Sequence, residues 1–303
     1  MIAELVRVTA ADGLRLDGAL RVPATDVAAQ IGIDAVACLH GTGGSFYSSS
    51  LFAGLAPRFL ALGAAVLAVN TRGHDLICTA SGGAAPKLQG AAFEIVDECR
   101  YDVAAWIDWL LERGYRRILL AGHSLGAVKA VYSLAHDAER KLSNVVGLLA
   151  ISPPRLSYSQ FCQGPKAAEF QADLAAAEAQ LRAGRGETLM SVRFPLPYLV
   201  SAAGYVDKYG PAERYNVLNF ATAVRCPALY TFGTIELDRN TAFQGLPELL
   251  GAQASQGADL KVAVIAGADH FYNGVHSELA DRLEFWLRRT FAQQATADRE
   301  SAT

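Results

Sequence analysis

Short apolar runs recur along the chain and alternate with longer stretches of helical pattern. Each run ends in small or polar residues, so it reads as a strand followed by a loop. Strands that are apolar on both faces are typical of a parallel sheet covered by helices on both sides. The sequence therefore predicts an α/β fold with a mostly parallel central sheet. The predicted strands are Ile33–Leu39, Ala64–Val69, Arg117–Ala121, Val145–Ile151, Ala228–Phe232 and Leu260–Ile265.

Amphipathic segments between these runs supply the covering helices. In the segment 95–111, apolar residues such as Val103, Trp106 and Leu110 recur at helical spacing. The same reasoning gives helices at 51–62, 125–135 and 276–291. Before the first run, residues 3–10 and 14–22 read as a hairpin around Ala11-Asp12-Gly13.

One long segment, 155–222, breaks the alternation. It contains an Ala-rich helical stretch at 167–183, and the apolar pattern requires no strand in it. We interpret it as a helical cap inserted between two strands of a core formed by residues 1–154 and 223–295. Residues 296–303 are expected to be a frayed polar tail.

Composition excludes several classes of protein. Apolar residues make up 51% of the 303 positions, which is ample for a buried core, and a net charge of -3 gives no electrostatic footprint for nucleic acid. The five cysteines are irregularly spaced and match no metal motif, which favours a reducing compartment. We find no signal peptide and no apolar run long enough to span a membrane, so the expected location is cytoplasmic. Oligomeric state, including a homodimer, stays open.

Residues Gly122-His123-Ser124-Leu125-Gly126 match the pattern G-x-S-x-G between a predicted strand and a predicted helix. A sharp strand-to-helix turn exposes the seryl oxygen beyond the sheet, and the flanking glycines allow neighbouring backbone to approach closely. The helix that follows directs free N–H groups toward developing negative charge. The pattern predicts Ser124 as a nucleophile.

With this motif in place, the chain resembles the α/β-hydrolase family over nearly its whole length. Three further segments carry the resemblance: His40-Gly41-Thr42-Gly43-Gly44-Ser45, Arg72-Gly73-His74-Asp75 and Gly267-Ala268-Asp269-His270-Phe271. In the family, the oxyanion hole uses the backbone N–H after the nucleophile and one from the His-Gly loop. The resemblance implies Leu125 and Thr42 as these donors, with Gly43 as the alternative to Thr42.

A serine needs a general base, and His270 is the histidine that follows the last predicted core strand. The third member of the triad departs from the family pattern. The family has an Asp three residues after the glycine that ends the seventh strand, and here Glu236 occupies that position after Gly233. Asp238 is the alternative, while Asp269, next to His270, is expected to form a turn. We predict the triad Ser124, Glu236 and His270.

Aromatic residues of the predicted cap are candidates for an apolar pocket over the sheet edge, although most are expected to pack the cap onto the core. They are Phe161, Phe170, Phe194, Tyr198, Tyr205, Tyr209, Tyr215 and Phe220.

The leading hypothesis is a serine hydrolase that cleaves an ester, thioester or lactone of a moderately apolar small molecule through an acyl-enzyme. No metal or organic cofactor is implied. An acyltransferase or a carbon–carbon bond hydrolase would use the same triad, and a ligand-binding receptor on a hydrolase scaffold is the alternative from another class.

Overall fold

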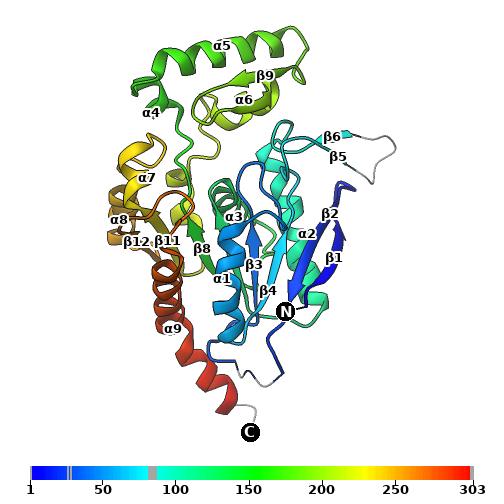
Figure 1. The fold of residues 1–303 in the computed structure, drawn as a ribbon, viewed down its shortest axis with the longest axis vertical. Helices are drawn as coiled ribbons and strands as arrows, with labels where there is room; N and C mark the ends of the chain where they lie inside the picture. The colour runs from blue at the N-terminus through cyan, green and yellow to red at the C-terminus, as the bar shows by residue number, and fades with distance from the viewer. Residues whose placement is uncertain (1, 26, 28, 81–86, 301–303) are drawn as a thin grey trace.

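A central sheet flanked by helices forms the body of the molecule in the computed structural model, which describes residues 2–25, 27, 29–80 and 87–300 (Figure 1). Within these residues the sheet has eight strands in the order β1-β2-β4-β3-β7-β8-β11-β12. From β4 to β12 all neighbouring strands are parallel, whereas β2 pairs antiparallel with both β1 and β4. The strands are β1 (Glu4–Thr9), β2 (Arg15–Arg21), β3 (Ala35–Leu39), β4 (Ala65–Val69), β7 (Ile118–His123), β8 (Val145–Ile151), β11 (Ala228–Gly233) and β12 (Leu260–Ile265). The predicted mostly parallel sheet is thus confirmed.

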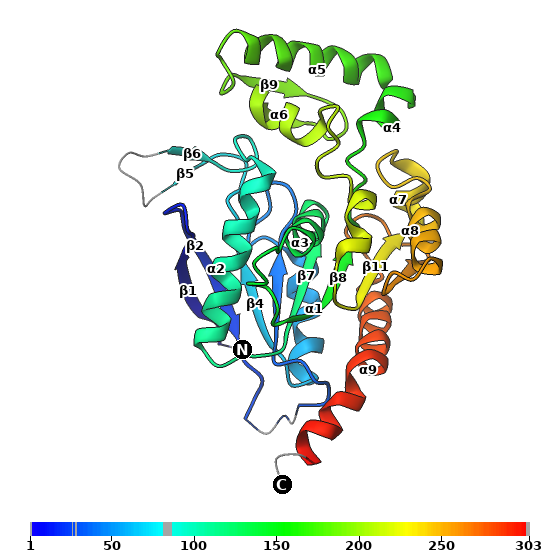
Figure 2. The same ribbon diagram turned by 180° about the vertical axis from the view of Figure 1, so that it is seen from behind.

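Two apolar cores lie on opposite faces of this sheet, and Figures 1 and 2 show the layers from opposite sides. Helices α1 (Ser50–Ala61) and α9 (His276–Glu300) cover one face, where Phe59 and Leu283 pack with Val66. Helices α2 (Cys99–Glu112), α3 (Leu125–Ala135) and α8 (Leu246–Ser255) cover the other, where Trp106 belongs to the core. Because both faces are covered, the parallel strands can be apolar throughout. Among the described residues, no helix combines the length and the apolar character that crossing a bilayer requires.

The segment between β8 and β11 forms a separate layer beyond the carboxyl edge of the sheet (Figure 1, green, top). The layer contains α4 (Tyr158–Gln163), α5 (Ala167–Arg182), β9 (Leu189–Val192), β10 (Tyr198–Ser201) and α6 (Ala202–Tyr209). The chain then returns to the core, where the 3-10 turns η2 (Val217–Asn219) and η3 (Ala221–Ala223) lie against α3. The expectation that this segment needs no strand is wrong, since β9 and β10 pair as an antiparallel hairpin. Four-residue strands are too short to give a clear alternating pattern, so they were not predicted from the sequence.

This layer is joined to the core through the stretch 91–97, which precedes α2. The Ser201 N–H donates to the Ala92 carbonyl oxygen at 2.7 Å, and the Val96 N–H donates to Asp207 Oδ2 at 2.8 Å. The Asp97 N–H donates to the Tyr215 hydroxyl oxygen at 2.9 Å. These bonds attach the layer to the segment that precedes α2.

Other local elements also escaped the sequence patterns. A hairpin of β5 (Cys78–Ala80) and β6 (Lys87–Gln89) and the short helix α7 (Thr234–Arg239) were not expected, and the start of the helix predicted at 95–111 is the 3-10 turn η1 (Val96–Glu98). Helix α9 extends past residue 291, where the sequence predicted its end, through Glu300. The residues 292–300 are rich in Ala, Gln, Glu and Arg, which favour helix. Of the predicted frayed tail, residues 301–303 lie outside the described residues.

Close backbone packing explains the glycines around position 124. A Cβ on Gly126 would overlap the carbonyl oxygens of Leu39 and His40, so α3 can approach the end of β3 only with a glycine there. A Cβ on Gly122 would likewise overlap the Gly126 carbonyl. The helix is therefore seated directly against the loop that follows β3.

We expect the substitution Gly126→Ala to lower the free energy of unfolding by about 1–3 kcal/mol, because the added methyl group forces α3 away from β3. Gly251→Ala is the matched control. Beyond its own helix backbone, a Cβ on this glycine of α8 would meet no heavy atom within 4 Å, and the change should raise the free energy by about 0.5–1 kcal/mol. Urea unfolding of both variants measures the difference. Equal stability of the two variants would contradict the packing argument.

Candidate active site

The backbone of Ser124 lies in a region that L-residues rarely adopt, with φ 56° and ψ -126°. It forms the single-residue turn between β7 and α3, and its N–H donates to the Ile151 carbonyl oxygen at 2.9 Å. Strained backbone of this kind persists only when the surrounding packing enforces it. The turn carries the Ser124 side chain to the carboxyl edge of the sheet.

The loop after β3 passes directly beside Ser124. A Cβ on Gly41 would lie 2.9 Å from the Ser124 Cβ, so the glycine allows the close approach. The Gly44 N–H donates to the Gly41 carbonyl oxygen at 3.1 Å, which closes a tight turn around Thr42 and Gly43. Leu125 is the first residue of α3, where backbone N–H groups have no carbonyl partner within the helix.

Three side chains that are distant in sequence come together at this edge. His270 Nε2 lies 3.0 Å from Ser124 Oγ, and His270 Nδ1 lies 2.7 Å from Glu236 Oε2. Asp238 instead lines a different cavity together with Gln244 and Glu248. The structure therefore brings Glu236, and not Asp238, to the imidazole.

Glu236 is buried, with 3% of its surface exposed, and its second carboxylate oxygen is fully engaged. Oε1 accepts a hydrogen bond from Ser152 Oγ at 2.5 Å and another from the Gly233 N–H at 2.7 Å. The Tyr272 hydroxyl lies 3.0 Å from Ser152 Oγ, and burial together with the Glu236 charge raises the pKa of Tyr272. Because Glu236 sits in the first turn of α7, its longer side chain can reach both Gly233 and His270.

His123 has a supporting position that sequence reasoning did not predict. Its Nε2 lies 2.7 Å from the carbonyl oxygen of His270, and since a carbonyl only accepts, Nε2 carries the proton. Burial and the neighbouring His270 lower the pKa of His123 to about 3, so the ring is neutral in the folded protein at neutral pH. His123 thus holds the backbone of His270. Asp269 forms a turn as expected, accepting from the Phe271 N–H at 2.9 Å.

Ser124 lines two cavities. The larger, of about 230 Å³, is lined by Ser48, Ser49, Ser50 and Phe271 among others, the smaller has a volume of about 100 Å³, and the walls of both are mainly apolar. Four residues line both cavities: Thr42, Ser124, Leu196 and His270. Leu196 comes from the loop between β9 and β10, so the layer over the sheet contributes one of the side chains that line both cavities. Leu196 was not predicted as a site residue, because a lone leucine in a loop leaves no periodic pattern in the sequence.

Most of the aromatic residues considered for the pocket pack elsewhere. Phe161, Phe170, Phe194 and Tyr205 form edge-on or tilted ring contacts with one another within the layer. Tyr215 and Phe220 pack against Tyr132 of α3. Of the eight, Tyr209 lines the smaller cavity. In the part of the chain that the structure describes, no three His, Cys, Asp or Glu residues form a group that could hold a metal ion.

The chain belongs to the alpha/beta hydrolase family, whose model matches residues 36–282. Its fold is similar to that of Est1E from Butyrivibrio proteoclasticus solved with ferulic acid, at 15% identity and a TM-score of 0.63, covering 94% of this chain and 99% of that one. An esterase from Pyrococcus furiosus is similar at 20% identity and a TM-score of 0.60, covering 95% and 91%.

A monoglyceride lipase from Saccharomyces cerevisiae, solved with a substrate analogue, is similar at 13% identity and a TM-score of 0.66, covering 96% of each chain. No curated protein sequence matches the chain. At these identities the solved structures establish the shared fold, and the chemistry must be argued from the residues themselves.

The contacts of His270 predict that Glu236→Gln slows covalent labelling of Ser124 by a fluorophosphonate. An amide cannot stabilise the imidazolium, and the rate should fall by roughly 10³-fold to 10⁴-fold. Asp238→Asn is the matched control and should change the rate by less than about twofold, because Asp238 faces another cavity. The labelling rate is measured by intact-protein mass spectrometry. A large loss in the Asp238 variant with none in the Glu236 variant would contradict this arrangement.

Proposed function

We propose that this protein is a serine hydrolase that cleaves a carboxylic ester of a small, uncharged and moderately apolar molecule. The observation that carries the proposal is the chain of hydrogen-bond distances from Ser124 Oγ to His270 Nε2 and from His270 Nδ1 to Glu236 Oε2. A nucleophile within reach of a base, itself oriented by a buried carboxylate, is the arrangement that acyl transfer requires.

In the proposed reaction, Ser124 Oγ attacks the acyl carbon while His270 Nε2 takes the hydroxyl proton. Glu236 keeps the ring oriented and stabilises the imidazolium that forms. His270 then donates the proton to the leaving alcohol, and the acyl group remains on Ser124. A water molecule, activated by the same nitrogen, hydrolyses the acyl-enzyme and restores the serine.

The negative oxygen of each tetrahedral intermediate needs two donors, for which we propose the N–H groups of Leu125 and Thr42. Thr42 lines both cavities beside Ser124, whereas Gly43 lines neither, and this supports Thr42 over Gly43. Donors of this kind are worth about 3–4 kcal/mol each in the transition state.

The lining of the two cavities supports an uncharged substrate. None of the described residues that line them is a Lys, Arg, Asp or Glu. Recognition of a phosphate-bearing thioester such as one of coenzyme A relies on cationic or clustered N–H groups, so we propose an ester or lactone before a thioester. The volumes, about 230 Å³ and about 100 Å³, fit a small acyl group in one cavity and a small alcohol group in the other.

We further propose that residues 155–222 act as a cap that shapes this site. Leu196 and Pro195, from the β9–β10 loop, and Tyr209, from α6, contribute to the cavity walls. Substrate would therefore be recognised jointly by the sheet edge and by the cap, as in capped members of the family.

Reaction with a fluorophosphonate probe and turnover of p-nitrophenyl acetate test the function. The wild-type protein should be labelled on the peptide that contains Ser124 and should hydrolyse the ester. Ser124→Ala should lose labelling and at least about 10³-fold of the rate, because the nucleophile is removed. Folded wild-type protein with neither labelling nor turnover would show a binding protein instead, and product analysis with added alcohol would reveal an acyltransferase.

Leu196→Ala tests the role of the cap in selecting the acyl chain. Because Leu196 lines both cavities, removing its side chain enlarges the space beside Ser124, so kcat/KM for p-nitrophenyl octanoate relative to the acetate should rise by roughly 10-fold. Leu199→Ala is the control, since Leu199 of β10 is 39% exposed and lines neither cavity. An unchanged chain-length profile in Leu196→Ala, measured by initial rates, would exclude Leu196 as a selective residue.

A further inference from the structure

Three charged side chains are buried together near residues 40–45, which we call the oxyanion loop. The proposed reaction uses none of the three. Lys129 of α3, Glu94 and Lys208 of α6 are each exposed by 1% or less. The Lys129 ammonium pairs with Glu94 Oε1, and Lys208 Nζ lies 3.7 Å from Glu94 Oε2. Burial alone would raise the pKa of Glu94, but the two ammonium groups outweigh it and hold that pKa below its ordinary value.

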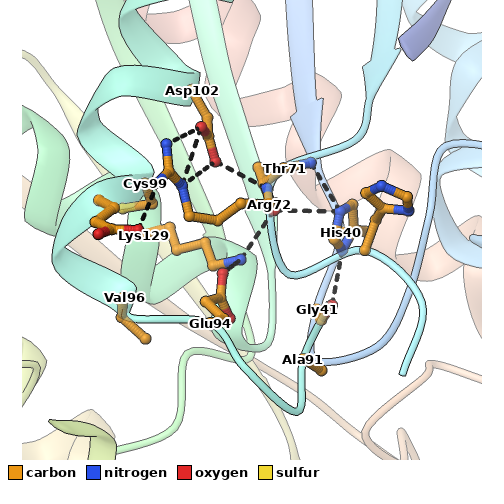
Figure 3. Close-up of polar contacts among 12 residues, drawn as sticks. His40, Gly41, Thr71, Arg72, Ala91, Glu94, Val96, Cys99, Asp102 and Lys129 are labelled. Carbon is orange, nitrogen blue, oxygen red and sulfur yellow. Dashed lines mark hydrogen bonds and ion pairs between the residues drawn. The ribbon is translucent and has the colours of Figure 1, made fainter. Parts of the chain in front are cut away.

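From Lys129 a continuous line of contacts leads through Thr71 and His40 to the oxyanion loop (Figure 3), and we call this line the relay. Lys129 Nζ donates to Thr71 Oγ1 at 2.9 Å, and the Thr71 N–H donates to His40 Nε2 at 3.0 Å. His40 Nε2 must therefore be unprotonated, so the ring proton is on Nδ1 and is donated to the Gly41 carbonyl oxygen at 2.8 Å. Burial and the charge of Lys129 lower the pKa of His40 to about 3, which keeps the ring in this neutral state.

On its other side the cluster is tied to the proposed cap. Lys208 Nζ donates to the Ala91 carbonyl oxygen at 2.9 Å as well as facing Glu94. Gly73 leaves room for the carboxylate, because a Cβ there would overlap the Glu94 side chain. The glycine of the Arg72-Gly73-His74 turn is thus required by the buried carboxylate.

Stability does not account for such a cluster. Burying charges costs desolvation energy, and apolar side chains of similar volume are often as stable or more stable in the same place. The three charges also sum to +1, so they do not neutralise one another. The feature that apolar residues could not reproduce is the directed line of donors and acceptors from α6 to Gly41.

We propose that Lys129 and Thr71 are positioning residues that hold the oxyanion loop, through His40 and Gly41, in register with the seating of the cap by Lys208 and Glu94. This inference rests on the proposed function, because it assigns the loop at Thr42 to stabilising the oxyanion. Donors must be placed to within a fraction of an ångström to act on the transition state, so loosening the loop should reduce kcat more than substrate binding.

The test uses Thr71→Val, which removes the hydroxyl but keeps the shape, the backbone N–H and every charge. Thr71→Ser restores the hydroxyl. Ser133→Ala is the control, a buried hydroxyl one turn from Lys129 on the same helix that contacts Cys99 Sγ at 3.6 Å instead of the relay. Lys208→Met removes the contact from the cap. Two quantities are measured for each variant: kcat and KM with p-nitrophenyl acetate, and hydrogen exchange of the backbone at residues 40–45.

Thr71→Val should lower kcat by roughly 10-fold to 100-fold with KM within about twofold, and should speed exchange at 40–45 several-fold. Thr71→Ser should recover most of both, Ser133→Ala should match the wild type, and Lys208→Met should reproduce the effect in weaker form. Wild-type kcat and hydrogen exchange in Thr71→Val would overturn the proposal. Wild-type values in Lys208→Met would overturn the proposed link between the cap and the oxyanion loop. A wild-type protein without esterase activity would refute the proposed function, while the exchange data would still decide whether the relay holds the loop.

Discussion

The close approach of α3 to the end of β3 is the constraint on which the site depends. Gly126 allows that approach, and it brings the first turn of α3 next to the loop after β3, which passes beside Ser124. The strained backbone of Ser124 is the consequence of joining β7 to a helix placed so closely. A looser packing would relieve the strain, but it would separate the serine from the backbone donors proposed to act with it.

Around Ser124, each group of the proposed mechanism is held by a neighbour to which we assign no chemical step. Ser152 and the Gly233 N–H hold Glu236, His123 holds the backbone of His270, and His40 holds Gly41. The supporting histidines are neutral because burial lowers their pKa. Preorganisation of this kind places dipoles before the reaction begins, so little reorganisation is needed when charge develops.

Features of this arrangement that leave a pattern within a short stretch of sequence could be predicted, and features that depend on contacts between distant segments could not. Apolar runs located all six parallel strands, and strand position singled out His270 and favoured Glu236, because each lies just after a strand that ends at the same sheet edge. The hairpin of β9 and β10 and the role of Leu196 were missed, since short strands and a lone leucine leave no periodic pattern. The Lys129–Glu94–Lys208 cluster joins three distant segments, and only the fold brings them together.

The central claim, that acyl transfer passes through Ser124, is tested most directly by trapping the intermediate. Wild-type protein mixed with p-nitrophenyl acetate and quenched in acid within milliseconds should carry one acetyl group, which peptide mass spectrometry should locate on Ser124. Two results would contradict the account. One is steady release of p-nitrophenol with the acetyl group on another residue, and the other is steady release with acetyl transfer that is unaffected when Ser124 is blocked.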